Sequence, residues 1–410
     1  MTGLTSDAGR GANRWPFRHI AWVLGVTAFG AGIPTPLYAL YEQQYHFTSG
    51  VLAVVFAAYT VGVLATMLLV APLSDVVGRK PVLYLGMALT AASGIAFIYA
   101  SGVLTLALAR VISGLAVGAT TSTATASMAS LEPRHDQHHV ARVSVASNFG
   151  GVGSGILLSG FLVEYAPAPT KLVFGVLIVV SLAGIVAVAT TRETVAPRPR
   201  ALRPKIQRLL VPQPIRRPFW VAAGSLAACY SIYGYFGAMA STFLRVDLHL
   251  ASPAGSATLI ATMFGLAAIT QLTLGQVRDR RALLVGLPLI FVATVFLTSS
   301  VPATSFALFI VGDAVLGIGV GFAYMGGVTL IDRVSPPAQR GEILSAFFIV
   351  GYLSLAIPTI GVGVTADSFG LPAAATSFGI ALGLTVAILY LVTRRTPTPP
   401  GGEGRPRQSS

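Results

Sequence analysis

The chain has 410 residues, of which 54% are hydrophobic and only 10% are charged, and its mean hydropathy is +0.75. Soluble globular proteins are about one quarter charged, so this composition excludes an ordinary soluble domain. The formal net charge is +13, but the basic residues are spread from loop to loop. A nucleic-acid-binding protein gathers them on one face, so we expect no nucleic-acid partner.

Apolar runs long enough to cross about 30 Å of hydrocarbon follow one another along the chain. They predict an all-α integral membrane protein with twelve transmembrane helices. The expected helices lie near residues 18–41, 51–72, 81–100, 103–130, 140–163, 172–190, 218–243, 255–277, 282–300, 304–330, 342–365 and 371–393.

These helices divide into two groups of six. We expect an N-terminal bundle over residues 18–190 and a C-terminal bundle over 218–393, joined by a basic, proline-rich linker over 191–217. The tails are residues 1–17 and 394–410. All but three of the 27 Lys and Arg residues fall in the tails, the linker and the loops on one side. Cytoplasmic loops retain such residues, so we expect a multi-pass protein of the cell (inner) membrane with both termini cytoplasmic.

The second half repeats part of the first at an offset of about 203 residues. Arg110, Gly114 and Gly118 are followed at that offset by Asp313, Gly317 and Gly321. Duplicated membrane helices are typical of secondary transporters, which bind substrate near the midplane between the repeats. The repeat therefore predicts a site between the two halves.

A short loop after the second expected helix resembles a known signature. Residues 71–80 read APLSDVVGRK, which is similar to the G-x-x-x-D-(R/K)-x-G-R-(R/K) pattern of the major facilitator superfamily, the large family of twelve-helix secondary transporters. Asp75, Gly78, Arg79 and Lys80 match the pattern. Ala71 and Val76 depart from it, and a weaker echo stands at Gly275, Asp279 and Arg280. Helix number, duplication and linker extend the resemblance to the whole chain.

The residues of this loop predict a conformational latch. Gly78 permits a tight turn, and Asp75 is placed to meet the positive N-terminal end of another helix, which the family suggests begins near Gly341. We expect Arg79 and Lys80 to pair with Glu132, and such contacts to break when the transporter switches state. The alternative, ordinary positive charge on the cytoplasmic side, explains Arg79 and Lys80 but not Asp75. The expected latch residues are Asp75, Gly78, Arg79, Lys80, Glu132, Asp279 and Arg280.

Arg110 and Asp313 are charged residues expected within transmembrane helices. A charge there is costly unless it is paired or hydrated, so each is a functional candidate. The run Arg110, Gly114, Gly118 resembles the family's helix-four pattern, whose arginine is linked with proton coupling in exporters. We expect the two charges to face each other or the substrate, and the pairing of Asp313 to decide whether it carries a proton. An arginine that extends to the outer surface and a static ion pair are the alternatives.

Small residues predict close helix packing. The expected packing glycines are Gly114, Gly118, Gly151, Gly155, Gly317 and Gly321. The segment with Gly151 and Gly155 resembles the family's antiporter pattern, but Ile156 replaces its proline and Ser159 one of its glycines. The absence of that proline weakens the antiporter assignment.

The remaining polar and aromatic residues at membrane depth predict the lining of a cavity for an amphiphilic organic molecule. They are Pro36, Tyr38, Asn148, Tyr230, Tyr233, Gln271, Tyr324 and Tyr352. Aromatic belts and simple packing are the alternatives for each. His135, Asp136, His138 and His139 lie in one loop without the spacing of a metal site, so we expect no metal and no cofactor.

Together these features predict a secondary transporter that works by alternating access and exports small amphiphilic molecules, such as drugs or metabolites, coupled to protons. Export rests on the family resemblance. Uptake by symport and facilitated diffusion are the alternatives within transport, and a non-transporting membrane sensor is the remote one. No catalytic constellation is present in the sequence, so we expect no enzyme activity. We expect the lipid bilayer, protons and a small-molecule substrate as partners of a functional monomer.

Overall fold

A computed structural model describes residues 15–69, 77–133, 136–195, 211–246, 250, 252–274, 277, 279–336 and 339–395. The described chain is helical, without a strand in these ranges. Hydrocarbon cannot hydrogen-bond to backbone groups, and a helix satisfies those groups internally, so long apolar runs fold as helices. The predicted all-α fold is confirmed.

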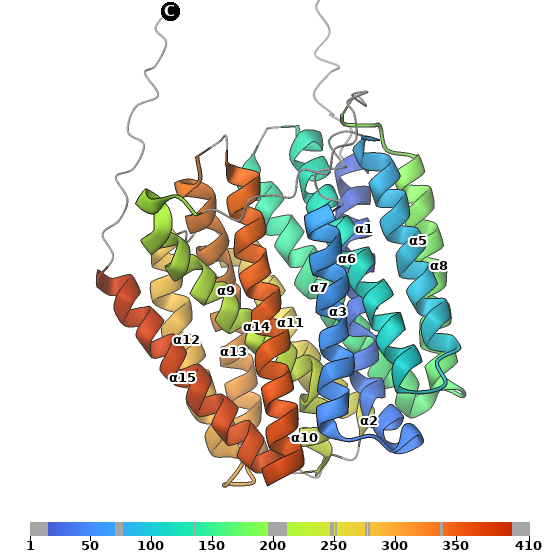
Figure 1. The fold of residues 1–410 in the computed structure, drawn as a ribbon, viewed down its shortest axis with the longest axis vertical. Helices are drawn as coiled ribbons and strands as arrows, with labels where there is room; N and C mark the ends of the chain where they lie inside the picture. The colour runs from blue at the N-terminus through green and yellow to red at the C-terminus, as the bar shows by residue number, and fades with distance from the viewer. Residues whose placement is uncertain are drawn as a thin grey trace, which may run out of the picture.

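The helices of the first half occupy the right of Figure 1, in blue to green. We call them the N-terminal bundle. They are α1 (Trp15–Gly32), α2 (Pro34–Tyr45), α3 (Ser49–Leu69), α5 (Arg79–Ile98), α6 (Val103–Leu131), α7 (Gln137–Tyr165) and α8 (Pro169–Ala189).

The helices of the second half occupy the left of Figure 1, in lime to red, and we call them the C-terminal bundle. They are α9 (Arg216–Ala238), α10 (Ala240–Val246), α11 (Pro253–Leu274), α12 (Asp279–Ser300), α13 (Phe306–Val334), α14 (Arg340–Phe369) and α15 (Leu371–Arg395), and a 3-10 turn, η2 (Gln213–Ile215), precedes them.

Eleven of the described helical segments are long and apolar enough to cross a membrane, with α1 and α2 counted as one. The expected seventh span corresponds to α9, which has 23 residues but is less apolar than the others. The first and seventh expected spans each contain a one-residue interruption, at Ile33 between α1 and α2 and at Met239 between α9 and α10, and both residues keep helical backbone angles.

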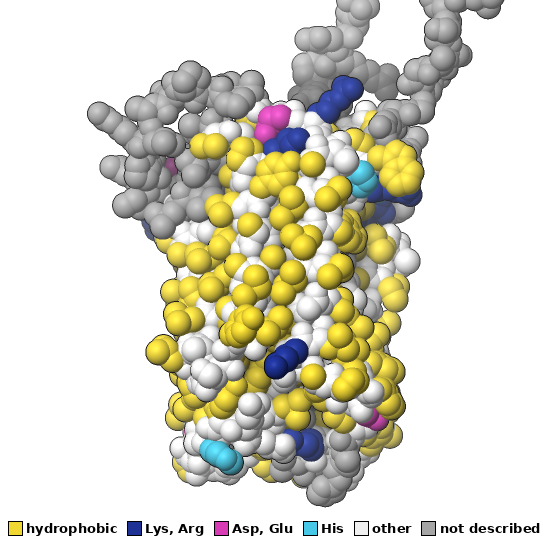
Figure 2. All heavy atoms as spheres, turned by 90° about the vertical axis from the view of Figure 1, so that its right-hand side faces the viewer, with side chains coloured by type: hydrophobic (Ala, Val, Ile, Leu, Met, Phe, Trp, Pro, Cys, Tyr) yellow, Lys and Arg dark blue, Asp and Glu magenta, His cyan; other side chains and the backbone are white. Residues whose placement is uncertain are grey.

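The outer surface is that of a protein in lipid. Hydrophobic side chains cover much of the face in Figure 2, and charged side chains are few there and gather mainly toward its ends. Large apolar side chains are exposed on several helices, including Leu104 at 74%, Val179 at 65% and Val61 at 63%. Such exposure would be unfavourable in water and is favourable against acyl chains.

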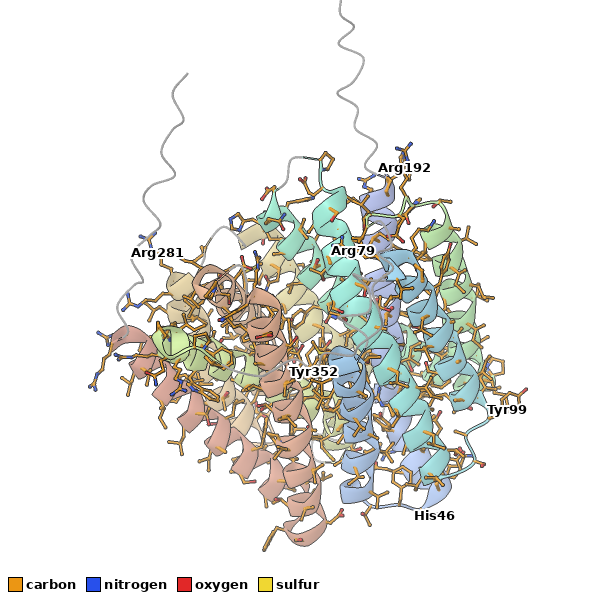
Figure 3. All side chains as sticks on the ribbon, turned by 45° about the horizontal axis from the view of Figure 1, so that its top comes forward. His46, Arg79, Tyr99, Arg192, Arg281 and Tyr352 are labelled. Carbon is orange, nitrogen blue, oxygen red and sulfur yellow. The ribbon has the colours of Figure 1, made fainter. Side chains whose placement is uncertain are left out.

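The two bundles meet along two helix pairs. Helix α3 packs against α14, and α7 packs against α11. Arg79, Arg192 and Arg281 lie toward one end of the molecule in Figure 3, and His46 and Tyr99 lie toward the other. We call the first end the basic face and the second the opposite face.

Candidate functional site

A cavity lies between the two bundles, with about 650 Å³ of atom-free space that includes space open to solvent. Tyr352, one of its lining residues, lies in the middle of the molecule in Figure 3. The full lining is Ala28, Ala31, Thr35, Phe56, Tyr59, Arg110, Val117, Asn148, Phe149, Val152, Ile156, Tyr230, Tyr233, Gly237, Phe264, Tyr324, Tyr352 and Leu355. The position between the repeats is where the sequence predicts a site.

Aromatic rings from both bundles form the walls of this cavity. The rings of Tyr230 and Tyr352 meet edge to face at 5.0 Å, and those of Phe149 and Tyr324 do so at 5.3 Å. Tyr230 and Tyr324 are nearly parallel, with centroids 6.3 Å apart. Rings held in this way form rigid, largely apolar walls with hydroxyl groups at fixed positions.

Arg110, on α6, is the charged residue in the lining, and it is only 1% exposed. Its Nε donates to the hydroxyl of Tyr38, and its Nη1 donates to the carbonyl oxygen of Ala31 at 3.2 Å. The guanidinium carbon lies 4.9 Å from the ring centroid of Phe56 and 5.6 Å from that of Tyr59. These contacts offset part of the cost of burying the charge. They also exclude an arginine that extends to the membrane surface.

Both interrupted helices contribute to the cavity. Pro34 and Pro36 have no backbone N–H to donate, so helical hydrogen bonds are missing at the boundary of α1 and α2, although Ile33 keeps helical angles. The carbonyl group of Ala31, just before this break, is the one that accepts from Arg110. Gly237, just before the break between α9 and α10, also lines the cavity. Interrupted helices at corresponding positions of two repeats mark the binding site in proteins of this architecture.

Asp313, on α13, does not lie where the sequence analysis expected it. It is 1% exposed, but it is not among the residues that line the cavity, and neither carboxylate oxygen has a hydrogen-bond partner. No ion pair joins it to Arg110, although both residues are described. The repeat gives the two residues equivalent backbone positions. The aspartate side chain is much shorter, so it remains between helices where the arginine reaches into the cavity.

The bundles are joined on the opposite-face side of the cavity. The hydroxyl of Thr242, on α10, donates to Glu42, on α2, at 3.0 Å, and the hydroxyl of Ser241 donates to the carbonyl oxygen of Thr35 at 3.5 Å. Further hydrogen bonds join α7 to α11 and α3 to α14 near the same face. The cavity is therefore covered on this side.

The loop before α5 has the turn that its sequence predicts. Gly78 has a φ of 102°, which favours glycine over other residues. The backbone N–H groups of Arg79 and Lys80 donate to the carboxylate of Glu193, at 3.1 and 3.0 Å. Glu193 thus binds the positive N-terminal end of α5, a role that the sequence analysis did not assign to it.

The side chains of the two basic residues bind helix ends of the same bundle. Arg79 Nη1 donates to the carbonyl oxygen of Ala126 and to the hydroxyl of Ser130, both at 2.7 Å. Lys80 Nζ donates to the carbonyl oxygens of Ala189 and Thr191, at 3.2 and 2.9 Å. Positive groups at C-terminal helix ends are favourable.

Glu132, which we expected to meet Arg79 and Lys80, accepts from the backbone N–H of Asp136 at 2.9 Å. The carboxylate found beside the two basic residues is Glu193. Glu193 binds the backbone N–H groups of these two residues and not their charged side chains, because the chain returns from α8 directly over the start of α5.

The other half of the expected latch is only partly described. Asp75 lies outside the described residues, and so does the side chain of Asp279, the first residue of α12. Arg280 donates from Nε to the carbonyl oxygen of Thr393 at 3.0 Å, and from Nη2 to that of Arg394 at 2.7 Å. It binds the end of α15 as Lys80 binds the end of α8.

The expected packing glycines lie at close helix contacts. A Cβ atom on Gly114 would stand 2.0 Å from the carbonyl oxygen of Tyr59 on α3, and one on Gly155 would stand 2.2 Å from that of Phe29 on α1. A Cβ atom would also lie under 3.0 Å from a neighbouring helix at Gly118, Gly151, Gly317 and Gly321. Only a residue without Cβ allows these backbones to approach so closely.

Of the expected cavity residues, Asn148, Tyr230, Tyr233, Tyr324 and Tyr352 line the cavity. Pro36, Tyr38 and Gln271 do not, which corrects that expectation.

Each of these three has another place. Pro36 lines a smaller pocket near the opposite face, and Tyr38 lies behind Arg110 as its hydrogen-bond acceptor. Gln271, 1% exposed, donates to the carbonyl oxygen of Gly321 and so joins α11 to α13. In the loop that holds the histidines, Asp136 accepts from the backbone N–H groups of His138 and His139 at the start of α7, and His135 is not described.

Sequence comparison places this architecture in a family. The Major Facilitator Superfamily matches residues 20–359 and 249–409. The chain belongs to the Major Facilitator Superfamily. It has the crossing helices of a multi-pass membrane protein, and members of this family are transporters rather than enzymes.

Curated relatives of this superfamily transporter include the purine ribonucleoside efflux pump NepI of Escherichia coli O127:H6 (strain E2348/69 / EPEC). It is 26% identical over 203 residues, which are 48% of this chain and 50% of that protein. Pumps of the same name from Escherichia coli O1:K1 / APEC and Escherichia coli O157:H7 are 27% identical over 203 residues. The transporter spans about half the length of the curated relatives it matches.

Several residues of the transporter's site were missed. Phe56, Tyr59, Phe149 and Phe264 line the cavity, but an aromatic residue inside an apolar run has no signal that separates it from lipid-facing ones. Glu193 did have a signal, since it is the one acidic residue in the basic segment 191–217.

Proposed function

We propose that this transporter exports small aromatic organic molecules from the cytoplasm by alternating access, coupled to the inward movement of protons. The observation that carries the proposal is the cavity between the repeats. It is lined by aromatic rings and Arg110 and is covered on the opposite-face side by hydrogen bonds between the bundles. A cavity covered on one side is suited to take up a substrate from the other.

The placement of charge supports an orientation in the membrane. We propose that the basic face is cytoplasmic, with both termini, the tails 1–17 and 394–410 and the linker 191–217 on that side of the inner membrane. Export and the aromatic substrate class are supported by the likeness to the purine ribonucleoside efflux pumps. We take residues 18–190 and 218–393 as the two moving bundles of a functional monomer.

Asp313 is our candidate for the proton carrier. It is a buried carboxyl group about two turns from the start of a crossing helix, without a hydrogen-bond partner among the described residues. An acidic group at this depth changes its interactions strongly when it binds a proton.

Facilitated diffusion without protons is the alternative. It is favoured by the absence of Asp and Glu among the lining residues of the cavity, because a proton bound outside the cavity has no direct contact with substrate.

The test uses purified protein in liposomes with radiolabelled inosine, the probe chosen from the name of the relatives, beside a panel of bicyclic aromatic compounds. An imposed pH gradient should drive accumulation of a transported compound. Asp313→Asn should abolish this accumulation but keep exchange of labelled for unlabelled compound, which needs alternating access and no proton release. If the parent protein exchanges the compound but does not accumulate it in response to the pH gradient, facilitated diffusion is favoured. No movement of any probe would refute aromatic transport.

A further inference from the structure

One donor in the central cavity is left without a partner. Two nitrogens of Arg110 are used by Tyr38 and Ala31, but Nη2 is buried and has no hydrogen-bond partner among the described residues. A buried donor on a cation is costly when unpaired. The side chain lines the cavity, but Nη2 itself is covered by its neighbours, so an occupant of the cavity supplies the missing acceptor when it displaces one of them.

The cavity has no acidic group to balance this charge. Its lining residues include neither Asp nor Glu, and the carboxyl group of Asp313 lies elsewhere. Positively charged aromatic compounds would therefore be repelled by Arg110 at short range in a medium of low dielectric constant. Aromatic rings can attract cations, but the rings of Phe56 and Tyr59 already face the guanidinium group.

We propose that the cavity selects planar aromatic molecules that are uncharged or anionic and carry a hydrogen-bond acceptor for Arg110 Nη2, and that it rejects aromatic cations. The flat molecule packs against the ring faces that line the cavity, such as those of Tyr230 and Phe149. This inference rests on the proposed function only in taking the cavity as the substrate site.

Three probes of similar size and different charge test the proposal: 2-naphthamide, 2-naphthoate and N-methylquinolinium. Binding is measured on purified protein in detergent, without a gradient. We expect the amide and the carboxylate to bind at least about tenfold more tightly than the cation, the scale of one hydrogen bond to a charged group. Equal binding of the cation, or no binding of any probe, would overturn the proposal.

Two variants separate the charge of Arg110 from its shape. Arg110→Gln should remove the preference against the cation, whereas Arg110→Lys should keep that preference and weaken binding of the amide, because lysine lacks the planar fork. Thermal unfolding shows whether each variant is folded, and if Arg110→Gln is not, the three probes on the parent protein still decide. Unchanged selectivity in a folded Arg110→Gln would also refute the inference. Binding of the amide without transport would refute the proposed function and leave the selectivity intact.

A different pair of residues supports a second inference, at the opposite face. Glu164, at the end of α7, accepts from the backbone N–H of Ala254 at 2.8 Å and from the hydroxyl of Ser252. Asp367, at the end of α14, accepts from the backbone N–H of Gly50 at 3.0 Å. Each carboxylate therefore binds the first turn of a helix of the other bundle, α11 in one case and α3 in the other.

The two contacts are equivalent under the internal repeat. Asp367 follows Glu164 by 203 positions, and Ala254 follows Gly50 by 204, which are the offsets of the repeat itself. A carboxylate at a helix N-terminus is stabilising, and both contacts must separate when the bundles part at this face.

We propose that Glu164 and Asp367 form a paired clasp that holds the opposite face closed. Without one carboxylate, the equilibrium should shift toward the state that is open at this face. The contribution of a charge at an exposed helix end predicts a shift of about two- to fivefold for Glu164→Gln or Asp367→Asn. The shifts should multiply in the double variant, since the contacts are separate.

The test measures the rate at which a membrane-impermeant thiol reagent labels Leu40→Cys in a Cys229→Ala background. Leu40 lines the small pocket between the bundles at this face. The rate should rise in each single variant and rise further in the double variant. The matched control is Asp332→Asn, which removes an exposed carboxylate paired with Arg340 inside one bundle and should leave the rate unchanged. A double variant that is labelled at the parental rate, or a control that accelerates labelling equally, would refute the clasp.

Discussion

Gly114→Ala should separate α3 from α6 and destabilise the transporter. The added Cβ atom would stand 2.0 Å from the carbonyl oxygen of Tyr59, and ordinary contact begins at 3.4 Å, so the helices must move apart by about 1.4 Å. The obstructing atoms belong to the backbone of α3, which cannot rotate away as a side chain can. Overpacking of this kind costs about 1–3 kcal/mol.

The assay is reversible unfolding in mixed micelles, compared with Gly265→Ala on α11. A Cβ atom on Gly265 would meet no atom within 4 Å, so this control should lose no stability and can gain up to about 1 kcal/mol from helix propensity. Because the ring of Tyr59 contacts Arg110, Gly114→Ala should also weaken binding of 2-naphthamide. If Gly114→Ala is as stable as Gly265→Ala, the close packing of α3 and α6 does not have the energetic importance argued above.

Three further predictions concern the basic face. Glu193→Gln should cost about 0.5 kcal/mol of unfolding free energy at pH 7, a value at the low end because the site is partly solvated. Although burial raises the pKa of Glu193, backbone N–H donors, among them those of Lys80 and Arg79, bring it below its usual 4.5. The difference between parent and variant should therefore be present above about pH 4.5 and vanish as the pH falls through the lowered pKa, and a difference that grows in acid would contradict it. Asp75→Asn should slow transport more than it lowers expression, and a parental transport rate would remove Asp75 from the latch. Cys229 is the single cysteine of the chain, so Pro199→Cys can be tested in a background that lacks it. A membrane-impermeant thiol reagent added to intact cells should not label this cysteine, and labelling from outside would reverse the proposed topology.

The architecture could be predicted because it depends on long-range regularities of composition. Apolar runs and the offset of 203 residues do not depend on any single residue. They predicted the helices, the repeat and the position of the central cavity. The interruptions at Ile33 and Met239 were not predicted, because a one-residue interruption hardly changes the hydropathy of its run.

Side-chain placement was less predictable. The repeat equates the backbones at Arg110 and Asp313, but the reach of a side chain depends on its length and on its neighbours. Glu193 was missed because its importance arises from the return of the chain over α5, a tertiary contact 113 residues away in sequence from Lys80. Tyr59 was missed because the packing of α3 decides which side of that helix faces the cavity, and the sequence around Tyr59 does not show it.

The modest apolarity of α9 has a consequence for the biosynthesis of the protein. Ser225 has its partner on a helix made later, because it donates to the carbonyl oxygen of Ala323 at 2.8 Å. Ser231 donates both within α9, to Ala227 at 2.8 Å, and to the carbonyl oxygen of Ser354 at 2.9 Å. Ala323 follows Ser225 by 98 residues, which a ribosome adds in about 5 to 20 s. During that interval α9 has neither the hydrophobicity of the other crossing helices nor its final partners. We therefore expect the insertion machinery to retain α9 until α13 and α14 have entered the bilayer.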